Sequence, residues 1–261
     1  MNFQAKHVFW VVSNIFGYAL GFRFLAPIHH AVVTLGLHAL GYDNAHPFSS
    51  SGEEWFIKKV LARLDSKGVS IDVGANVGKY AALLLCYTKG SVYAIEPLSS
   101  SFTQLQKHAS ERLQVSHCAI ADFNGTGQIF SQAEGWEGAT LSKELVETKT
   151  ISEEVSVMTL DTFVEKNAIQ HIDFIKVDTE GHEREVFLGM QKLLQEAPPL
   201  FIQFEFNILH LKRGHTLLSL TQLLPGYTFY RLLPHGMVKI DPEKYINNIF
   251  MFSNVIAKRI T

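Results

Sequence analysis

The chain has 261 residues, of which 47% are hydrophobic and 18% are charged, and its formal net charge is −2 at pH 7. This length accommodates one large α/β domain with a small appendage, and the composition excludes an intrinsically disordered chain. Because the charge creates no global basic field, we expect no nucleic-acid partner. The two cysteines, Cys86 and Cys118, lie in separate apolar stretches, which predicts buried free thiols.

Residues 1–50 form an apolar segment that we expect to be helical and distinct from a domain over residues 51–261. A transmembrane helix needs about 20 apolar residues. The charge-free run between Lys6 and Arg23 is too short, and Pro27 and several histidines interrupt the next one. Because no signal-peptide pattern is present, we expect a cytoplasmic chain. The aromatic side chains of this segment either cover the main domain or a partner subunit, which we favour, or contact a membrane surface peripherally.

The remaining sequence alternates apolar runs of strand length with segments of helical character. Strands are expected at residues 69–73, 91–95, 115–120, 155–158, 171–177, 200–206, 227–233 and 249–256. Helices are expected at residues 53–64, 77–87, 100–111, 160–167, 183–194 and 216–224, and polar turns at 122–127. This alternation predicts a Rossmann-like α/β sheet that is mostly parallel, with helices on both faces and an antiparallel edge strand near the C-terminus.

The first predicted strand ends in a glycine-bearing turn, IDVGANVG, at residues 71–78. Open α/β sheets bind ligands at the carboxyl ends of their strands, and glycine lets the backbone come close to the ligand. A dinucleotide site has the pattern Gly-x-Gly-x-x-Gly, whereas only Gly74 and Gly78 are present here. The carboxylate of Asp72 would repel a phosphate and suits an ammonium group. The turn therefore favours a cationic cofactor such as S-adenosylmethionine.

Two further acids follow the next two predicted strands. Glu96 comes 18 residues after Gly78, at the position where an acidic side chain accepts hydrogen bonds from both ribose hydroxyls. Asp122 follows the third strand and is a candidate to accept from the adenine amino group, although aspartate is also common in turns. Both positions are consistent with a nucleoside-containing cofactor.

The motifs IDVGANVGKY, AIEP, CAIADFNG, VMTLDTF and IDFIKVDTEGHE resemble the FkbM-type methyltransferase family, from about Gly52 to Lys258. The resemblance implies a class I methyltransferase sheet and methyl transfer from S-adenosylmethionine to a hydroxyl of a sugar, polysaccharide or related natural product. It implies that residues 135–142 form a loop near cofactor and acceptor. The matching motifs imply a cofactor site lined by Asp72, Gly74, Asn76, Gly78, Glu96 and Asp122.

Acidic and histidine side chains gather after the fourth and fifth strands of this predicted sheet. An acceptor hydroxyl must lose its proton, and a positioned general base typically contributes about 10²–10⁴-fold. Asp178 is the strongest candidate because it ends a buried strand. His182 has an unperturbed pKa that suits a general base, but it opens a helix, where a solvent-exposed histidine without a catalytic role is also expected. Lys176 is expected on the face of Asp178, paired with an acid. The catalytic candidates are Asp178, Glu180, His182 and Glu205.

Two other interpretations stay open at this point. Asp178, Glu205 and Asn207 carry oxygen atoms that suit a divalent metal such as Mg²⁺, but we do not favour a metal because such a set arises easily by chance. A non-catalytic scaffold with a cofactor fold, in a glycan-synthesis or membrane assembly, is the alternative to an enzyme. His210 and His215 are expected to be loop histidines.

Overall fold

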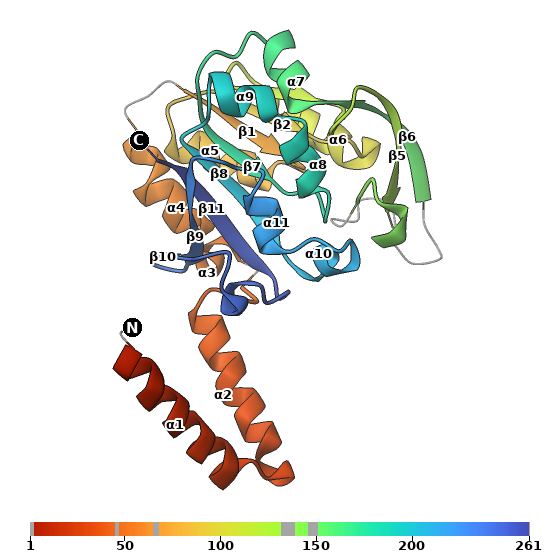
Figure 1. Cartoon of the computed structure of the whole chain (residues 1–261). Coiled ribbons are helices and arrows are strands. Elements are labelled where there is room, and N and C mark those ends of the chain that lie inside the picture. The colour runs from red at the N-terminus through yellow and green to blue at the C-terminus, as the bar shows by residue number, and fades with distance from the viewer. Residues whose placement is uncertain (1–2, 45–46, 65–67, 132–138, 146–150, 261) are drawn as a thin grey trace. The chain divides into compact units, whose positions relative to one another are not determined.

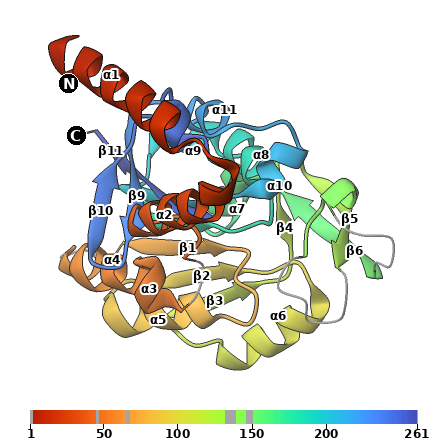
Figure 2. The same cartoon turned by 90° about the horizontal axis from the view of Figure 1, so that it is seen from below.

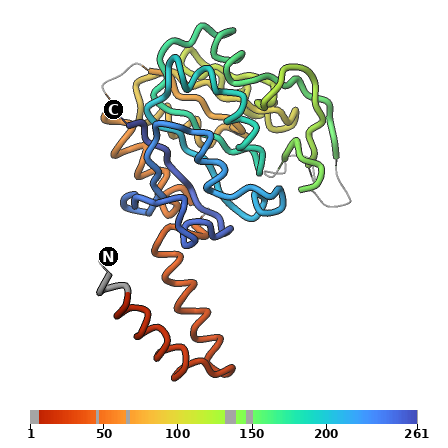
Figure 3. The backbone as a smooth tube through the Cα atoms, in the orientation of Figure 1, coloured from red at the N-terminus to blue at the C-terminus, as the bar shows by residue number. Residues whose placement is uncertain are grey.

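The computed structural model describes residues 3–44, 47–64, 68–131, 139–145 and 151–260. Contacts divide the chain into two compact units, Met1–Leu40 and Gly41–Thr261. Figure 3 follows the path of the backbone through both units. The second unit thus begins at Gly41, ahead of residue 51, where the sequence places the boundary. Tyr42 explains this difference because its side chain is fully buried, its hydroxyl donates to the carbonyl of Ile246 at 2.6 Å, and the Arg231 guanidinium lies 3.7 Å from its ring.

The first unit is helical, as the sequence predicts. It contains α1 (Phe3–Leu20), a short 3-10 turn (Arg23–Leu25) and α2 (Ala26–Ala39) (Figure 1). No single helix in the described part of the chain is long and apolar enough to cross a membrane. The stretches His7–Leu20 and Arg23–Ala39 meet the length and hydropathy requirement only together, and they are bent by 103°.

The second unit contains an eight-stranded sheet with the order β10-β9-β11-β8-β7-β1-β2-β3. Its five parallel strands carry the carboxyl ends at which the site forms: β1 (Val69–Val73), β2 (Val92–Ile95), β3 (Leu113–Ser116), β7 (Ile172–Val177) and β8 (Phe201–Phe206). This arrangement confirms the mostly parallel, Rossmann-like sheet. Strand β1 has the predicted bounds, and β7 and β8 begin one residue later than predicted.

The other end of the sheet is antiparallel, also as predicted. The last strand, β11 (Ser253–Arg259), inserts antiparallel between β8 and β9 (Tyr227–Leu233), and β10 (Gly236–Lys239) forms the antiparallel edge beyond β9. The sequence analysis missed β10 because it has only four residues and none of them is buried. It placed β11 at residues 249–256, a few residues too early.

A second, three-stranded sheet corrects the sequence analysis between residues 115 and 158. The strand expected at residues 115–120 divides into β3 and β4 (Ala119–Ile120), which belong to different sheets. The expected polar turn leads directly into β5 (Gly125–Ser131), which pairs antiparallel with β6 (Ile151–Met158) along its whole length. Most residues of β5 are polar or glycine, so hydrophobic pattern alone does not reveal this strand.

Helices cover both faces of the main sheet (Figure 2). One face packs against α7 (Leu160–Lys166), α8 (Glu183–Leu188), α9 (Gln191–Glu196) and α11 (Leu217–Thr221). The other face packs against α4 (Glu53–Lys59), α5 (Lys79–Tyr87) and α6 (Ser99–Leu105), and the single turn α3 (Phe48–Ser51) precedes α4. Several helices are shorter than predicted. The helix expected at 183–194 is interrupted at Gly189, where a Cβ atom would lie 2.1 Å from the carbonyl oxygen of Ala121.

The cysteines follow the prediction only in part. Both are free thiols, and Cys118 is buried as expected. Cys86 is exposed on α5, so the prediction that it is buried is wrong. A nine-residue helix lying on a sheet exposes one side to solvent, and an apolar stretch in the sequence does not show which of its residues lies on that side.

Candidate functional site

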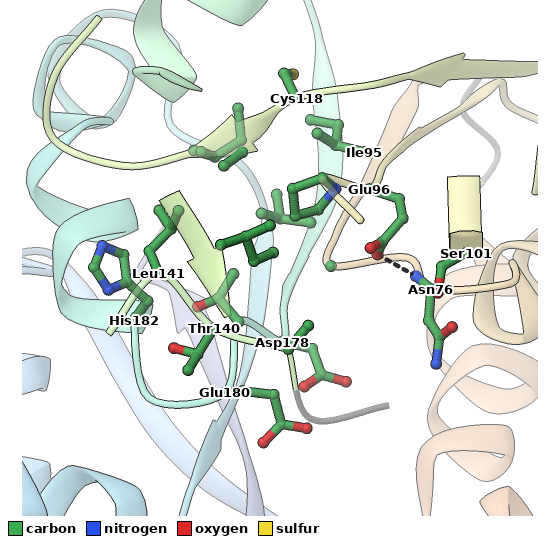
Figure 4. A pocket seen from close by; sticks show the side chains of 18 residues that line it. Asn76, Ile95, Glu96, Ser101, Cys118, Thr140, Leu141, Asp178, Glu180 and His182 are labelled. Atoms are coloured by element: carbon green, nitrogen blue, oxygen red, sulfur yellow. Dashed lines mark hydrogen bonds between the residues drawn. The ribbon is translucent and has the colours of Figure 1, made fainter. Parts of the chain in front are cut away.

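Two adjoining cavities open at the carboxyl ends of β1, β2, β7 and β8. The first cavity, shown in Figure 4, lies between the turn after β1, the end of β2 and the β4–β5 sheet. The second, which we call the acidic cavity, has a volume of about 300 Å³ and reaches from the same turn to the end of β8. Four residues line both cavities: Gly74, Asn76, Asp178 and Glu180.

The turn after β1 requires a glycine because it touches the end of β7. Gly74 has a φ of +83°, and a Cβ atom there would lie 1.8 Å from the carbonyl oxygen of Asp178. The amide of Asp178 in turn donates to the carbonyl of Val73 at 2.9 Å. Gly78 lines neither cavity; it precedes α5 with a φ of +87°, and its Cβ position is 2.7 Å from a methyl group of Leu105. Gly74 thus lets the turn after β1 approach the backbone of Asp178, and Gly78 leaves room for the side chain of Leu105.

Glu96 faces the first cavity from the end of β2. It is buried, and its carboxylate accepts hydrogen bonds from the backbone amides of Asn76 and Leu98, both at 2.8 Å (Figure 4). Burial nevertheless raises the pKa of Glu96 to about 7. Asn76 has a φ of +50°, and its side-chain oxygen is buried without a hydrogen-bond partner among the described residues. Strained backbone and an unpaired polar atom are typical of a ligand site.

The structure does not bring Asp122 to the cofactor site. Its side chain is exposed and lines neither cavity. The wall at which it was expected consists instead of Cys118, Ala119 and Ile120. The chain turns outward after Ala121 to begin the β5–β6 hairpin, and this turn carries Asp122 to the surface.

A row of polar side chains crosses three neighbouring strands on the face covered by α4 and α5. The strand registers place Asp72 of β1 beside Lys176 of β7, and Lys176 beside Gln203 of β8. The Lys176 ammonium is buried, pairs with Asp178 at 2.5 Å and lies 4.9 Å from the centre of the Tyr80 ring. This pairing confirms the expectation that Lys176 contacts an acid at the end of its strand.

Carboxylates outnumber the ammonium group around this row. Burial alone would lower the pKa of Lys176, but the negative charges of Asp178, Asp72, Glu53 and Glu205 together raise it. Burial raises the pKa of Asp72 to about 6, and burial together with the neighbouring Asp178 raises the pKa of Glu205 well above its usual range. Both oxygens of Asp72 are buried and make no hydrogen bond of normal geometry with the described residues, although the amide of Ala81 and the ammonium of Lys176 lie close enough to lower its pKa. The cavity is therefore built to receive positive charge.

Three of the four catalytic candidates lie together. Asp178, Glu180 and Glu205 all line the acidic cavity. Glu180 has a φ of +53°, a conformation uncommon for a residue with a side chain. Its strain coincides with the loop where the two cavities meet.

His182 lies apart from these carboxylates. It lines the first cavity but not the acidic one, and in Figure 4 it points to the side opposite Asn76 and Glu96. Its Nδ1 is 3.2 Å from the hydroxyl of Ser142 and 3.2 Å from the guanidinium of Arg213. Burial lowers the pKa of His182, which favours the neutral ring. These contacts fit a wall of the cofactor cavity better than a base at the acceptor.

Glu183 and His210 hold the loop after β7, and the sequence analysis gave neither residue a role at the site. One oxygen of Glu183 accepts from the amide and the hydroxyl of Thr179, and the other is 2.8 Å from the Nε2 of His210. Burial alone would raise the pKa of Glu183. The contact with His210 and these hydrogen bonds outweigh that effect and lower the pKa to about 2. His210 is fully buried in α10 (Ile208–Lys212), so the expectation of a loop histidine is wrong there, whereas His215 lies in a loop as expected. Glu183 ends the motif IDFIKVDTEGHE, but no motif marks His210.

Two further expectations concern the metal and the loop at residues 135–142. Among the described residues, no group of three or more His, Cys, Asp or Glu side chains is placed to hold a metal ion. The side-chain oxygen of Asn207, one of the suggested ligands, accepts instead from the amide of Leu209 at 2.9 Å. Residues 132–138 lie outside the described part of the chain, and residues 139–141 line the first cavity, so the described end of this loop is where the resemblance places it.

Comparisons with known proteins agree with this geometry. A family model, the methyltransferase FkbM domain, matches residues 72–230, which is more than half of the chain. The hexuronic acid methyltransferase AglP of Haloferax volcanii is 28% identical over 161 residues, which cover 60% of this chain and 64% of that protein. The match thus spans less than two thirds of the relative's length.

Solved structures with a similar backbone have low sequence identity. The METTL16 methyltransferase domain has a TM-score of 0.44 and 11% identity, and covers 80% of this chain and 66% of its own. An rRNA methylase from Streptococcus thermophilus has a TM-score of 0.43 and 14% identity, and covers 80% of this chain and 94% of its own. Both scores are below 0.5, so the fold assignment depends on the strand order described above.

The contact between Gly74 and Asp178 gives a test with a matched control. Gly74→Ala should destabilise the protein more than Gly226→Ala, measured by thermal or urea unfolding. Both glycines have a φ of +83°, but a Cβ atom at Gly226 would meet nothing within 4 Å. The control therefore measures the left-handed backbone alone, which costs about 1–2 kcal/mol. Equal losses of stability in the two variants would contradict the close approach of β1 to β7.

Proposed function

Because the chain belongs to the FkbM methyltransferase family, we propose that it transfers the methyl group of S-adenosylmethionine to a hydroxyl group of a sugar or a related polyol. The observation that carries this proposal is the buried carboxylate of Asp72, which lines a cavity where several acids share the charge of Lys176, together with the buried Glu96 in the adjoining cavity. The name of the AglP relative, a hexuronic acid methyltransferase, supports a sugar acceptor. None of the comparisons supports a non-catalytic scaffold.

The residues present fit this cofactor. Glu96 keeps free lone pairs on both carboxylate oxygens after accepting two backbone amides, so it can also accept from ribose hydroxyls. The apolar side chains of Ile120, Ile129 and Leu141 offer a wall for the adenine ring. Asp72 shares the single charge of Lys176 with other acids, and a cofactor ammonium would supply a further positive charge. Of the six cofactor residues taken from the sequence, four line the cavities: Asp72, Gly74, Asn76 and Glu96.

The cofactor, when bound, supplies a methyl group on a sulfonium, and the thioether that remains after transfer is a good leaving group. The protein must therefore mainly orient the acceptor hydroxyl and take its proton. Asp178 is held in an ion pair with Lys176, so its carboxylate already has a partner. Glu205 lines the same cavity, and its raised pKa suits a base that works near neutral pH. We therefore assign proton removal to Glu205, and to Asp178 the task of holding Lys176 in place.

Replacing the proposed base tests this assignment. Glu205→Gln should lower kcat for methyl transfer to a sugar acceptor by about 10²–10⁴-fold while S-adenosylmethionine affinity is retained. The wild-type rate should fall as the pH decreases, because Glu205 must be ionised, and the residual rate of the variant should lose this dependence. Glu111→Gln, at an exposed acid outside both cavities, is the matched control. A wild-type kcat in Glu205→Gln would remove Glu205 from the mechanism.

The charge of the site predicts proton release when the cofactor binds. The pKa of Asp72 is about 6 in the free protein, and a bound cation should lower it. Binding at pH 6 should thus release up to about half a proton from Asp72, and close to none at pH 8. Calorimetry of S-adenosylmethionine binding in two buffers of different ionisation enthalpy measures this number. Equal proton release at the two pH values would contradict a cation held by Asp72.

Asp72→Asn provides the accompanying variant. Since folding raises the pKa of Asp72 above its usual value of 3.8, its ionised form destabilises the free protein increasingly as the pH rises from about 4 to 6. The variant should therefore unfold at a higher temperature than the wild type at pH 7.5, yet bind the cofactor more weakly. A lower unfolding temperature would show that Asp72 has a structural partner.

We also propose that residues 3–40 contact a lipid bilayer, with the chain otherwise in the cytoplasm. Large apolar side chains on α1 are exposed all around the helix rather than along one stripe; they include Val8, Phe9, Trp10, Val12, Ile15, Phe16 and Tyr18. No Asp or Glu occurs before Asp43. A partner protein would cover one side of such a helix, whereas lipid surrounds it, and the bent pair of helices suits insertion without a straight span.

Sedimentation with phosphatidylcholine vesicles tests this contact on the full chain. The wild type should sediment with the vesicles, and the double variant Phe9→Glu, Phe16→Glu should remain in the supernatant. Tyr245→Glu, at a side chain that is 88% exposed in the second unit, should behave as the wild type. A wild type that stays in the supernatant and elutes as a dimer in gel filtration would indicate a protein partner instead.

A further inference from the structure

Two phenylalanine side chains line the acidic cavity without belonging to the proposed cofactor site. Phe48 is the first residue of α3, Phe252 comes just before β11, and both line the acidic cavity but not the first one. Glu96, the proposed partner of the ribose, lines only the first cavity, whereas Glu205, the proposed base, lines only the acidic one. The two rings therefore lie in the cavity of the base, where the acceptor must bind.

Both phenylalanines lie outside residues 72–230, the part of the chain that the family model matches. The matched part contains Glu205 and the four residues proposed for the cofactor: Asp72, Gly74, Asn76 and Glu96. The segments on either side of the family domain thus supply this wall of the cavity. Its chemistry follows from this chain's own contacts and not from the family match.

A buried hydrogen-bond network joins these two segments to the centre of the sheet. The side-chain amide of Gln203 on β8 donates to the carboxylate of Glu53 on α4 at 2.8 Å and to the side-chain oxygen of Asn254 on β11 at 2.9 Å. The hydroxyl of Ser51 on α3 donates to the other oxygen of Glu53 at 2.7 Å. All four side chains are buried. Helix α3 and the start of β11 are thereby both fixed to β8.

The rings themselves are also held before any ligand binds. Phe48 packs edge-on against Tyr80, with their ring centres 5.8 Å apart, and the hydroxyl of Tyr80 donates to Gln203 at 2.7 Å. The carbonyl of Phe252 accepts from the amide of Asp43 at 2.7 Å. A ligand that binds to this wall therefore does not have to order it, which reduces the entropic cost of binding.

This wall suits the apolar face of a sugar ring. Phe48 and Phe252 are half-buried and line the cavity, so part of each ring is open to a ligand. The C–H groups on one face of a pyranose carry small positive charges that are attracted to the negative face of an aromatic ring, and their burial removes apolar surface from water. Asn207 lines the same cavity, and its side-chain NH₂ group can donate to hydroxyl oxygens.

The size of the cavity suits a single ring. Its volume of about 300 Å³ is at the lower end of the range of about 300–1,000 Å³ that ligand pockets have. An open-chain polyol carries the same kind of hydroxyl groups but has no fixed apolar face, and it loses more conformational freedom on binding. The wall should therefore distinguish the two forms.

On the basis of the function proposed above, we infer that Phe48 and Phe252 form the acceptor subsite and that they select a sugar in its pyranose form over the corresponding open-chain polyol. The ring binds with its C–H face on the two phenylalanines. Its hydroxyl groups then meet the polar side chains of the cavity, Glu205 among them. The segments outside the family domain thereby determine the acceptor class.

Binding of matched sugars and polyols tests this selectivity without relying on catalysis. Methyl glucoside, methyl galactoside and methyl mannoside are titrated by ligand-observed NMR into the full chain saturated with S-adenosylhomocysteine. Each glycoside is compared with its own alditol, namely glucitol, galactitol or mannitol. The glycoside that binds most tightly should bind at least about tenfold more tightly than its alditol, which corresponds to about 1.4 kcal/mol. Equal affinities, or tighter binding of the alditol, would overturn the inference.

Replacing one ring of the wall tests the subsite directly. Phe252→Leu removes the ring but keeps an apolar side chain, so it should weaken binding of that glycoside by about threefold to tenfold and leave the alditol unchanged. Phe252→Tyr should restore the wild-type affinity. Phe250→Leu is the matched control, because Phe250 is half-buried in the same segment, packs against Phe206 and lines neither cavity. An unchanged affinity in Phe252→Leu, or an equal loss in Phe250→Leu, would overturn the subsite.

Cofactor binding separates this inference from the proposed function. Phe252→Leu should bind S-adenosylhomocysteine as the wild type does, which also shows that the variant is folded; if it does not fold, Phe48→Leu takes its place with the same expected result. Binding of S-adenosylhomocysteine by the wild type with none of the three glycosides would overturn the acceptor subsite alone. Failure of the wild type to bind S-adenosylhomocysteine would instead overturn the proposed function.

Discussion

The buried ammonium of Lys176 is the interaction on which the site depends. It lies among four carboxylates, those of Asp72, Asp178, Glu53 and Glu205, in the middle of a sheet face otherwise covered by apolar contacts with α4 and α5. Without this charge the acids would repel one another in a space largely closed to water, and they would be protonated or the strands would separate. Burial and the excess of acids over one lysine raise the pKa values of Asp72 and Glu205, which supports the proposal that the cavity binds a cation.

The geometry around this lysine is held by backbone approach and by the buried contact between Glu183 and His210. At Gly74 the turn after β1 touches the carbonyl of Asp178, so the turn proposed to hold the cofactor and the end of β7 are in direct contact. From the opposite side, Glu183 and His210 fix the amide of Thr179 in the same loop. The strained backbone of Glu180 persists because both neighbours determine its position.

Sequence patterns predicted the parts of this fold in which local and tertiary preferences agree. The buried strands β1, β7 and β8 were located within one residue because continuous apolar runs bounded by polar turns have few other interpretations. The hairpin of β5 and β6 and the edge strand β10 were missed or shortened, since they are exposed or short and gain their stability from strand pairing. Asp122 and Cys86 were misplaced for a related reason: their exposure depends on where the chain turns or which side of a helix faces the sheet.

The sequence by itself determined the class of sheet, the glycine turn with its leading acid, and the acids at the strand ends, because strand alternation and turn chemistry are local properties of the chain. Only the tertiary structure decided which of these groups meet. It joined Asp178 to Lys176, buried Asp72 beside that pair, placed His182 in the wall of the first cavity only, and brought Phe48 and Phe252 to the acidic cavity from segments about 200 residues apart. Such pairings depend on strand register and burial, which are set when the whole sheet assembles.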